Sequence, residues 1–281
     1  MNSDERFAKL VDKKNHLRSV LEKVGVGKGH HLVLHASYRK IRSAFPGLTI
    51  KNLLETLQKL LTPAGSLIMP TFTYCFKKKL GNSKIYSPDL TPSEVGAVSE
   101  YFRHMPGVTR TASPTHSFAL WGKVSSEIMS ENCPASPLGK GSVLEWITNQ
   151  PQSYILGMGI DFSAMSYCHY LEIQAKVPWA DVFPWDFMGI EKKGVSITGE
   201  QILIEVPGCS KSFINFEKYL LQNKFIISFQ HRHLNIYYMP VKLLYEQGMV
   251  YFKENYIDML CEPGKCQACD VRRQLIRKMD P

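Results

Sequence analysis

The chain has 281 residues, 44% of them hydrophobic, which is enough for one large domain or for a large domain with a small satellite. No apolar run approaches the ~20 residues of a membrane span, and the charged N-terminus does not resemble a secretion signal. We therefore expect a cytoplasmic protein without a membrane partner. The 34 Lys and Arg against 25 Asp and Glu give a net charge of +9, which favours anionic partners. Without zinc-finger spacing or RNA-binding aromatics, we expect a phosphorylated small molecule and no nucleic acid.

The first half of the chain alternates between helical and strand-like segments. Apolar residues recur at steps of three and four from Phe7 to Val24, which predicts a helix, and the apolar segment HLVLHA at 31–36 predicts a strand. A leucine-rich helix follows from Thr49, and SLIMP at 66–70 predicts a second strand.

A third helix is expected from Thr91 to Phe102. Thr91 would cap it, with Pro92 at its first position and Glu94 as the capping-box acid. SFALWG at 117–122 and SYILGMG at 153–159 predict further buried strands. This alternation indicates an α/β fold with a mostly parallel mixed sheet flanked by helices.

The pattern changes beyond about Trp179 to short antiparallel strands around a turn, followed by two helical segments. We interpret residues 1–180 as an α/β domain and residues 181–281 as a smaller α+β C-terminal region. The absence of a low-complexity linker indicates that the two parts pack together.

The stretch YILGMGIDFSAMSYCHYLEIQAK at 154–176 carries the strongest catalytic pattern. A strand stops at its glycines and leads into a helix bearing Ser166, His169 and Glu172 at spacings of three. That spacing places a hydroxyl, an imidazole and a carboxylate on one helix face, as a general base and its orienting partner require. The alternative is a helix capped by Ser166 with an ordinary core histidine.

Three cysteines near the C-terminus, Cys261, Cys266 and Cys269, form a C-x4-C-x2-C pattern. They are weak candidates for metal ligands, with a distant fourth at Cys209, His231 or His233. Because the pattern falls short of the usual zinc spacing, we expect no metal to be required.

Five segments in order are similar to the antibiotic N-acetyltransferase superfamily, typified by aminoglycoside 3-N-acetyltransferases that use acetyl-CoA. The segments are VLHASYRKI, SLIMPTFTY, EYFRHMPGVTRTASPTHSFALWG, SPLGKGSVLEWI and ILGMGIDFSAMSYCHYLEIQAKVP. His169 and Glu172 match the superfamily's His-x-x-Glu, and Ser166 replaces its usual threonine. The chain departs from the pattern at Ser113, where many members have a histidine; here His116 follows slightly later.

The resemblance implies acyl-CoA as co-substrate, bound by the 1–180 domain. His169 would be the base or proton relay and Glu172 would set its tautomer, although the departing CoA thiolate is an alternative proton acceptor. The residues expected to bind the cofactor are Ser37, Thr73, Arg110 and Ser117. The residues expected to contact the substrate are Tyr74, His116 and Trp179. As alternatives, the hydroxyls would only cap turns and the basic residues would only be solvated.

The sequence is compatible with three functions. The first is N-acylation of an aminosugar nucleotide, such as a dTDP-linked 4-amino-4,6-dideoxyhexose of surface glycans, as in the branch that includes the anthrose-pathway N-acyltransferase; the positive charge favours it. The alternative is an aminoglycoside 3-N-acetyltransferase conferring resistance. A distant third is a zinc-containing nucleic-acid-binding module with a basic tail of Arg272, Arg273, Arg277 and Lys278. The oligomeric state is not predicted.

Overall fold

The computed structural model describes residues 14–279. The first part of the predicted N-terminal helix, including Phe7, lies outside the described residues, and residues 14–23 are helical as expected. Within the described range, no helix combines the length and apolar character needed to cross a lipid bilayer.

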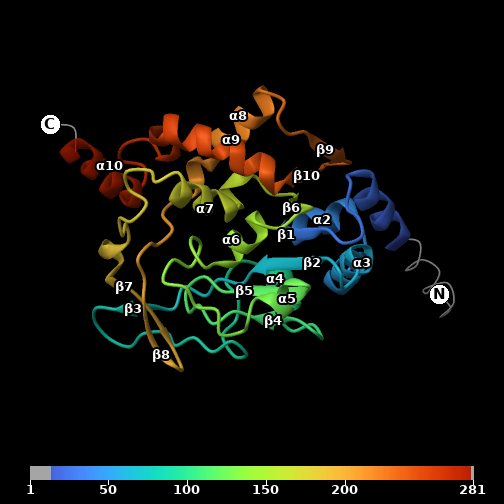
Figure 1. Ribbon diagram of the computed structural model, residues 1–281, viewed down its shortest axis with the longest axis horizontal. Helices are drawn as coiled ribbons and strands as arrows, with labels where there is room; N and C mark the ends of the chain where they lie inside the picture. The colour runs from blue at the N-terminus through green and yellow to red at the C-terminus, as the bar shows by residue number, and fades with distance from the viewer. Residues whose placement is uncertain (1–13, 280–281) are drawn as a thin grey trace.

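A seven-stranded sheet forms the centre of the molecule (Figure 1), in the order β4-β5-β2-β1-β6-β10-β9. Its strands are β1 (His31–Ala36), β2 (Ser66–Pro70), β4 (Thr109–Arg110), β5 (Phe118–Gly122), β6 (Ser153–Met158), β9 (Ser228–His231) and β10 (Leu234–Pro240). Strand β1 pairs in parallel with β2 and β6, whereas the outer pairings are antiparallel. The predicted α/β class with a mixed, helix-flanked sheet is confirmed, and the parallel arrangement is limited to the three central strands.

A second, three-stranded sheet contains β3 (Phe76–Lys78), β7 (Ile190–Ser196) and β8 (Gly199–Ile202), all antiparallel. The chain beyond residue 180 supplies β7 and β8 to this sheet and β9 and β10 to the large one. The predicted division at residue 180 therefore cuts through both sheets.

Helices cover both faces of the large sheet (Figure 1). They are α2 (Tyr38–Ala44), α3 (Ile50–Leu61), α4 (Ala97–Phe102), α5 (Val124–Glu127), α6 (Val143–Thr148), α7 (Tyr167–Gln174), α8 (Ile214–Gln222), α9 (Val241–Glu254) and α10 (Gln267–Met279), with short 3-10 turns η1 (Phe162–Ala164), η2 (Asp186–Met188), η3 (Lys211–Phe213) and η4 (Tyr256–Met259). In β1, Leu32 and Leu34 pack into one core and Val33 into the other. This two-sided burial explains why the centre of the strand, Leu32 to Leu34, is apolar on both faces.

The prediction for the start of α4 was wrong. The side chain of Thr91 does not cap a helix but accepts a hydrogen bond from the Ser87 amide, 2.8 Å away. Helix α4 begins only after Gly96, whose φ of 125° interrupts any earlier helix. By contrast, Thr49 caps α3 as predicted, accepting from the Asn52 amide at 3.1 Å.

Strand β6 ends at Met158 and is followed by Gly159, which has a φ of 72°. A Cβ at this position would lie 2.8 Å from Leu234 Cδ1 and 2.9 Å from Lys40 Cβ. Glycine therefore permits both the turn and the close packing of α2 and β10 around it. The turn directs the chain through η1 into α7, beyond the carboxyl ends of the parallel strands, where open α/β sheets usually bind ligands.

Candidate active site

Helix α7 brings His169 and Glu172 into direct contact. Nδ1 of His169 lies 2.9 Å from Oε2 of Glu172, and both side chains are buried. Ser166 occupies the N-cap position of α7 but makes no capping hydrogen bond. The helical spacing predicted from the sequence is therefore the observed one, and the Ser166 hydroxyl is left available for other contacts.

Three side chains donate to or pair with the Glu172 carboxylate. Besides His169, the Trp179 indole donates to Oε1 at 3.0 Å, and Arg272 Nη1 donates to the same oxygen at 2.8 Å. Burial alone would raise the pKa of Glu172, but Arg272, His169 and Trp179 outweigh it and hold the pKa at about 2. Glu172 is therefore ionised at neutral pH.

An ionised Glu172 fixes the protons of His169. A carboxylate can only accept hydrogen bonds, so Nδ1 of His169 must carry the proton that it donates. In the neutral imidazole, Nε2 then presents a lone pair. This is the tautomer that a general base requires.

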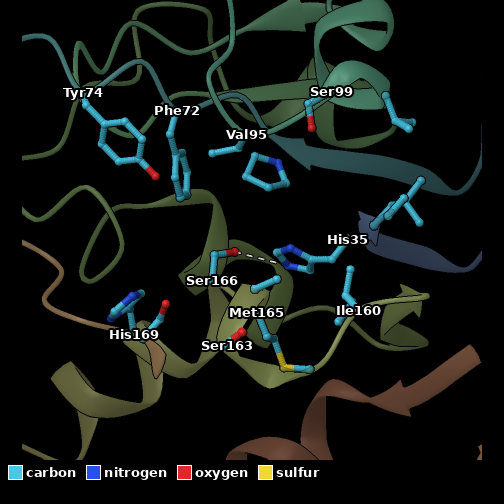
Figure 2. Close-up of a pocket in the computed structure, with 16 residues that line it drawn as sticks. His35, Phe72, Tyr74, Val95, Ser99, Ile160, Ser163, Met165, Ser166 and His169 are labelled. Carbon is cyan, nitrogen blue, oxygen red and sulfur yellow. Dashed lines mark hydrogen bonds between the residues drawn. The ribbon is translucent and has the colours of Figure 1, made fainter. Parts of the chain in front are cut away.

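Two cavities meet at His169. The smaller has a volume of about 220 Å³ and the larger about 490 Å³. Phe72, Tyr74, His169 and Ser210 line both. Figure 2 shows His169 and the two aromatic rings at one side of the smaller cavity. Ligands in either cavity can thus reach the imidazole of His169.

The smaller cavity lies at the carboxyl ends of the parallel strands, where β1 contributes His35 and β2 contributes Pro70. His35 is not among the site residues predicted from the sequence, although it is a polar side chain that follows the apolar run Leu32 to Leu34 of β1. Burial lowers the pKa of His35 to about 4, so it is neutral at physiological pH. Its Nε2 lies 3.3 Å from the Ser166 hydroxyl, as the dashed line in Figure 2 marks.

The larger cavity is lined mainly by apolar and aromatic side chains. Those at its wall include Phe76, Trp185, Met188 and Ile190, together with His116. Burial, with a smaller contribution from His169, lowers the pKa of His116 to about 3. Of the described residues, no Asp or Glu lines either cavity, and Lys211 supplies the cation at the larger one.

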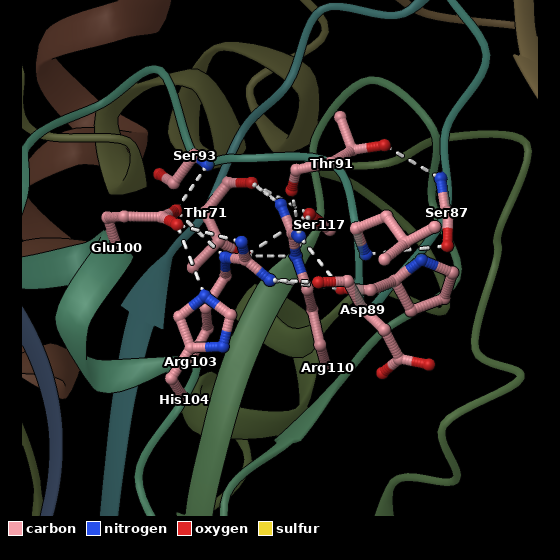
Figure 3. Close-up of polar contacts among 12 residues, drawn as sticks. Thr71, Ser87, Asp89, Thr91, Ser93, Glu100, Arg103, His104, Arg110 and Ser117 are labelled. Carbon is pink, nitrogen blue, oxygen red and sulfur yellow. Dashed lines mark hydrogen bonds and ion pairs between the residues drawn. The ribbon is translucent and has the colours of Figure 1, made fainter.

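The predicted cofactor residues Arg110, Ser117 and Thr73 are buried and bonded within the protein. Arg110 Nη1 donates to the carbonyls of Pro88 and Thr91, at 3.0 and 2.6 Å. Its other nitrogens bond to Thr71 and Ser117, as Figure 3 shows. The Thr73 hydroxyl donates to the Pro114 carbonyl at 2.6 Å. These side chains hold loops together and line neither of the cavities at His169; Arg110 instead lines a separate cavity of about 500 Å³, together with Arg103 and His104.

Other predicted residues divide between the cavities and the core. Tyr74 lines both cavities and His116 lines the larger one, as a role in substrate contact requires. Trp179 lines neither cavity. It is fully buried, and its indole N–H donates a hydrogen bond to Glu172. Ser37 caps the start of α2 by position and is half-buried, just beyond the His35 end of β1.

The basic C-terminal residues also differ from expectation. Arg272 is buried against Glu172, and Arg273 pairs with Asp270 at 2.8 Å. These two guanidiniums are therefore not free to bind nucleic acid; the side chains of Arg277 and Lys278 lie outside the described residues. The contact of Arg272 with Glu172 joins residues 100 positions apart in the chain, so no local sequence pattern indicates it.

In the structure a fourth cysteine lies beside the three of the C-x4-C-x2-C pattern. Of the three candidates for that place, Cys209 lies beside Cys261, Cys266 and Cys269. His231 instead stacks on Phe45, with ring centroids 4.6 Å apart.

Comparison with known proteins identifies the family. Residues 33–253 match the family model described as aminoglycoside 3-N-acetyltransferase. The chain belongs to this family. Aminoglycoside N(3)-acetyltransferase IV of Salmonella sp is 29% identical over 169 residues, which are 59% of this chain and 61% of that protein. The SPbeta prophage-derived aminoglycoside N(3')-acetyltransferase-like protein YokD of Bacillus subtilis (strain 168) is 25% identical, over 60% of this chain and 67% of that protein.

Solved structures of the family share the fold. The aminoglycoside acetyltransferase AAC(3)-IVa apoenzyme superposes with a TM-score of 0.78 at 23% identity, covering 93% of this chain and 97% of that one. AAC-IIIb in a binary complex with CoASH gives 0.70 at 16% identity, covering 86% and 96%. At this level of identity the superpositions show the fold alone. The sequence matches span about three fifths to two thirds of the curated relatives' lengths.

Proposed function

We propose that this family member is an acyl-CoA-dependent N-acyltransferase with His169 as its general base. The observation that supports this most directly is the position of His169, which faces two cavities while Glu172 holds its other ring nitrogen. One cavity can then receive the thioester and the other the amine, with the base between them. A transferase that joins two substrates needs this arrangement.

The reaction follows from that geometry. Nε2 of His169 takes a proton from the acceptor amine as its nitrogen attacks the thioester carbonyl carbon. The tetrahedral intermediate collapses, the C–S bond breaks, and the CoA thiolate leaves as the amide forms. His169 then returns the proton to the thiolate or to water. Glu172 stabilises the transient imidazolium through Nδ1.

We assign the thioester arm to the smaller cavity. Helix α2 begins just beyond His35 and carries three exposed cations, Arg39, Lys40 and Arg42. The phosphates of CoA need such groups, and these are solvent-accessible where Arg110 is not. The smaller cavity, which has both apolar and polar walls, would then hold the pantetheine and acyl portion. The relative AAC-IIIb has been solved with CoASH bound, which supports CoA as the donor here.

The first candidate for the acceptor is an aminoglycoside. The relatives carry that substrate class in their names, and a variant of AAC(3)-IVa has been solved in complex with a gentamicin. The larger cavity would place one amino group of such a compound beside His169. Its 490 Å³ accommodates one or two sugar rings, with the rest of the compound extending outward.

A second candidate is an aminosugar carried by a nucleotide diphosphate. The absence of Asp and Glu from the described walls of both cavities, and the presence of Lys211, favour an anionic acceptor over a polycation. The net charge of +9 acts in the same direction. Aromatic side chains such as Tyr74 and Trp185 would stack on the base.

The test is release of free CoA thiol from acetyl-CoA, measured with gentamicin-type aminoglycosides and with dTDP-aminosugars side by side. Thiol release with an aminoglycoside, dependent on His169, supports the first candidate. A kcat/KM at least ~100-fold higher for the dTDP-aminosugar would support the second, since that ratio reflects about 3 kcal/mol of transition-state binding. No amine-dependent thiol release with any acceptor of either class would contradict the proposal.

A further inference from the structure

Four free cysteines come together at the wall of the larger cavity, which Cys209 lines. Cys209 precedes η3, Cys261 and Cys266 lie between η4 and α10, and Cys269 lies in the first turn of α10. Their Sγ atoms all lie within 4.8 Å of one another, and those of Cys209 and Cys261 are 3.6 Å apart. Segments separated by 52 residues therefore place four sulfurs around one point.

This geometry matches a single tetrahedral ion. With Zn–S bonds of about 2.3 Å, the sulfurs of a zinc site with four cysteine ligands lie about 3.8 Å apart. Thiols are weak hydrogen-bond partners, so four of them gain little from each other in the absence of a metal. A purely sulfur ligand set excludes the hard cations Ca²⁺ and Mg²⁺, which take oxygen ligands.

We propose that Cys209, Cys261, Cys266 and Cys269 bind one structural Zn²⁺ ion. Four thiolates and the ion carry a net negative charge, and cations lie near to balance it. Arg273 donates from Nη2 to the Cys261 carbonyl, and Lys211 lies two positions after Cys209. Basic neighbours of this kind stabilise thiolates.

The ion ties together two segments that support the active site. Gly208 packs so closely on Arg272 that a Cβ at this glycine would collide with the guanidinium group. Gly208 adjoins the ligand Cys209, and Arg272 lies one helical turn after the ligand Cys269. The zinc thus fastens α10 to the 208–211 segment of the cavity wall and keeps Arg272 on Glu172. With four cysteine ligands the ion would have no open coordination position, so its role is structural.

The primary test is metal content, measured by inductively coupled plasma mass spectrometry on full-length protein purified without a polyhistidine tag or chelators. We expect about one zinc per chain in the wild type and a loss of most of it in Cys266→Ser. The matched control is Cys133→Ser, because Cys133 is an exposed cysteine outside the cluster. That variant should keep its zinc.

A second measurement does not depend on whether the cysteine variants fold. Co²⁺ exchanged into the wild-type protein should give the intense visible bands and the sulfur-to-metal charge-transfer band of a tetrahedral thiolate site. Removing zinc with a chelator should lower the melting temperature, and one equivalent of Zn²⁺ should restore it.

Three outcomes would overturn the proposal. One is wild-type protein that holds no zinc as purified and takes up none when one equivalent is added under reducing conditions. Another is stoichiometric iron in place of zinc. The third is peptide mapping by mass spectrometry showing that the four cysteines form two disulfides. None of these measurements requires the acyl-transfer activity, so they succeed or fail independently of the proposed function.

Discussion

Each oxygen of Glu172 is committed, one to His169 and the other to Arg272 and Trp179. All three partners act as donors, so the site needs an acceptor at every position that Glu172 fills. This requirement makes the carboxylate difficult to replace even by the amide of the same shape.

We expect Glu172→Gln to lower kcat by ~100-fold or more at neutral pH, a loss typical of removing general-base catalysis. The glutamine oxygen must face Arg272 and Trp179, which leaves its NH2 group facing His169. Nδ1 then becomes the acceptor and Nε2 carries the proton, which is the wrong tautomer for a base. The measurement is kcat and KM for thiol release. A variant with kcat close to that of the wild type would show that Glu172 does not set the tautomer.

The His169–Glu172 contact was predictable, because a spacing of three on a helix always brings two side chains to one face. Arg272 and Trp179 were not, because they reach Glu172 through the tertiary fold. Trp179 was assigned to substrate from its aromatic character alone, and Arg110 to phosphate from its charge alone. Neither character reveals whether a side chain points into a cavity or into the core.

At the scale of elements, helix α10 is docked onto α7 through the ion pair of Arg272 with Glu172. Both side chains are nearly inaccessible to solvent, at 2% and 3% exposure. Removing one member of such a pair leaves the other as an uncompensated buried charge.

We expect Arg272→Ala to reduce the free energy of unfolding by ~3–5 kcal/mol, the range observed when a buried ion pair loses one partner. The variant should also raise the pKa of Glu172, because Arg272 is the largest influence lowering it. Denaturant unfolding measures the first effect. The control is Arg18→Ala, whose pair with Glu22 is about half exposed. If both variants lost the same small amount, Arg272 would not be buried as described.

Element positions were predicted best where the sequence repeats a local pattern over many residues. The leucines of α3 and the apolar run Leu32 to Leu34 of β1 meet that condition. The start of α4 was not predicted correctly. Thr91, Pro92 and Glu94 form a capping pattern, but the contacts that Thr91 makes in the folded protein override it. The antiparallel direction of β5 and the joining of β10 to the large sheet depend on chain reversals that periodicity does not encode.

At the scale of the whole molecule, neutral histidines buried beside the active site couple stability to pH. The folded-state pKa of His35 is about 4 and that of His116 about 3, both lowered by burial. An unfolded chain protonates its histidines near a pH of about 6.5, so below that pH the unfolded state binds more protons than the folded state. The contribution of these histidines to stability is therefore complete above that pH and falls as the pH is lowered toward the folded-state pKa values.

We expect the lowered pKa of His35 alone to reduce the free energy of unfolding by about 2 kcal/mol as the pH falls from about 7.5 to about 5. This follows from roughly 1.36 kcal/mol per pKa unit. The measurement is the free energy of unfolding by urea at both pH values, for the wild type and for His35→Gln. The variant should lose less stability over this interval than the wild type, whatever its stability at the higher pH. Equal losses in the two proteins would mean that His35 is protonated in the folded state.

If His169 removes the proton from the acceptor amine, its loss must slow turnover, and the turnover number of His169→Ala tests this role. It is measured as CoA thiol release at saturating acetyl-CoA with the best acceptor found for the wild type. We predict that kcat falls by ~100-fold or more while acetyl-CoA affinity changes by no more than a few fold. A variant that kept more than about a tenth of wild-type turnover would contradict this role, because the departing thiolate or water would then be the proton acceptor.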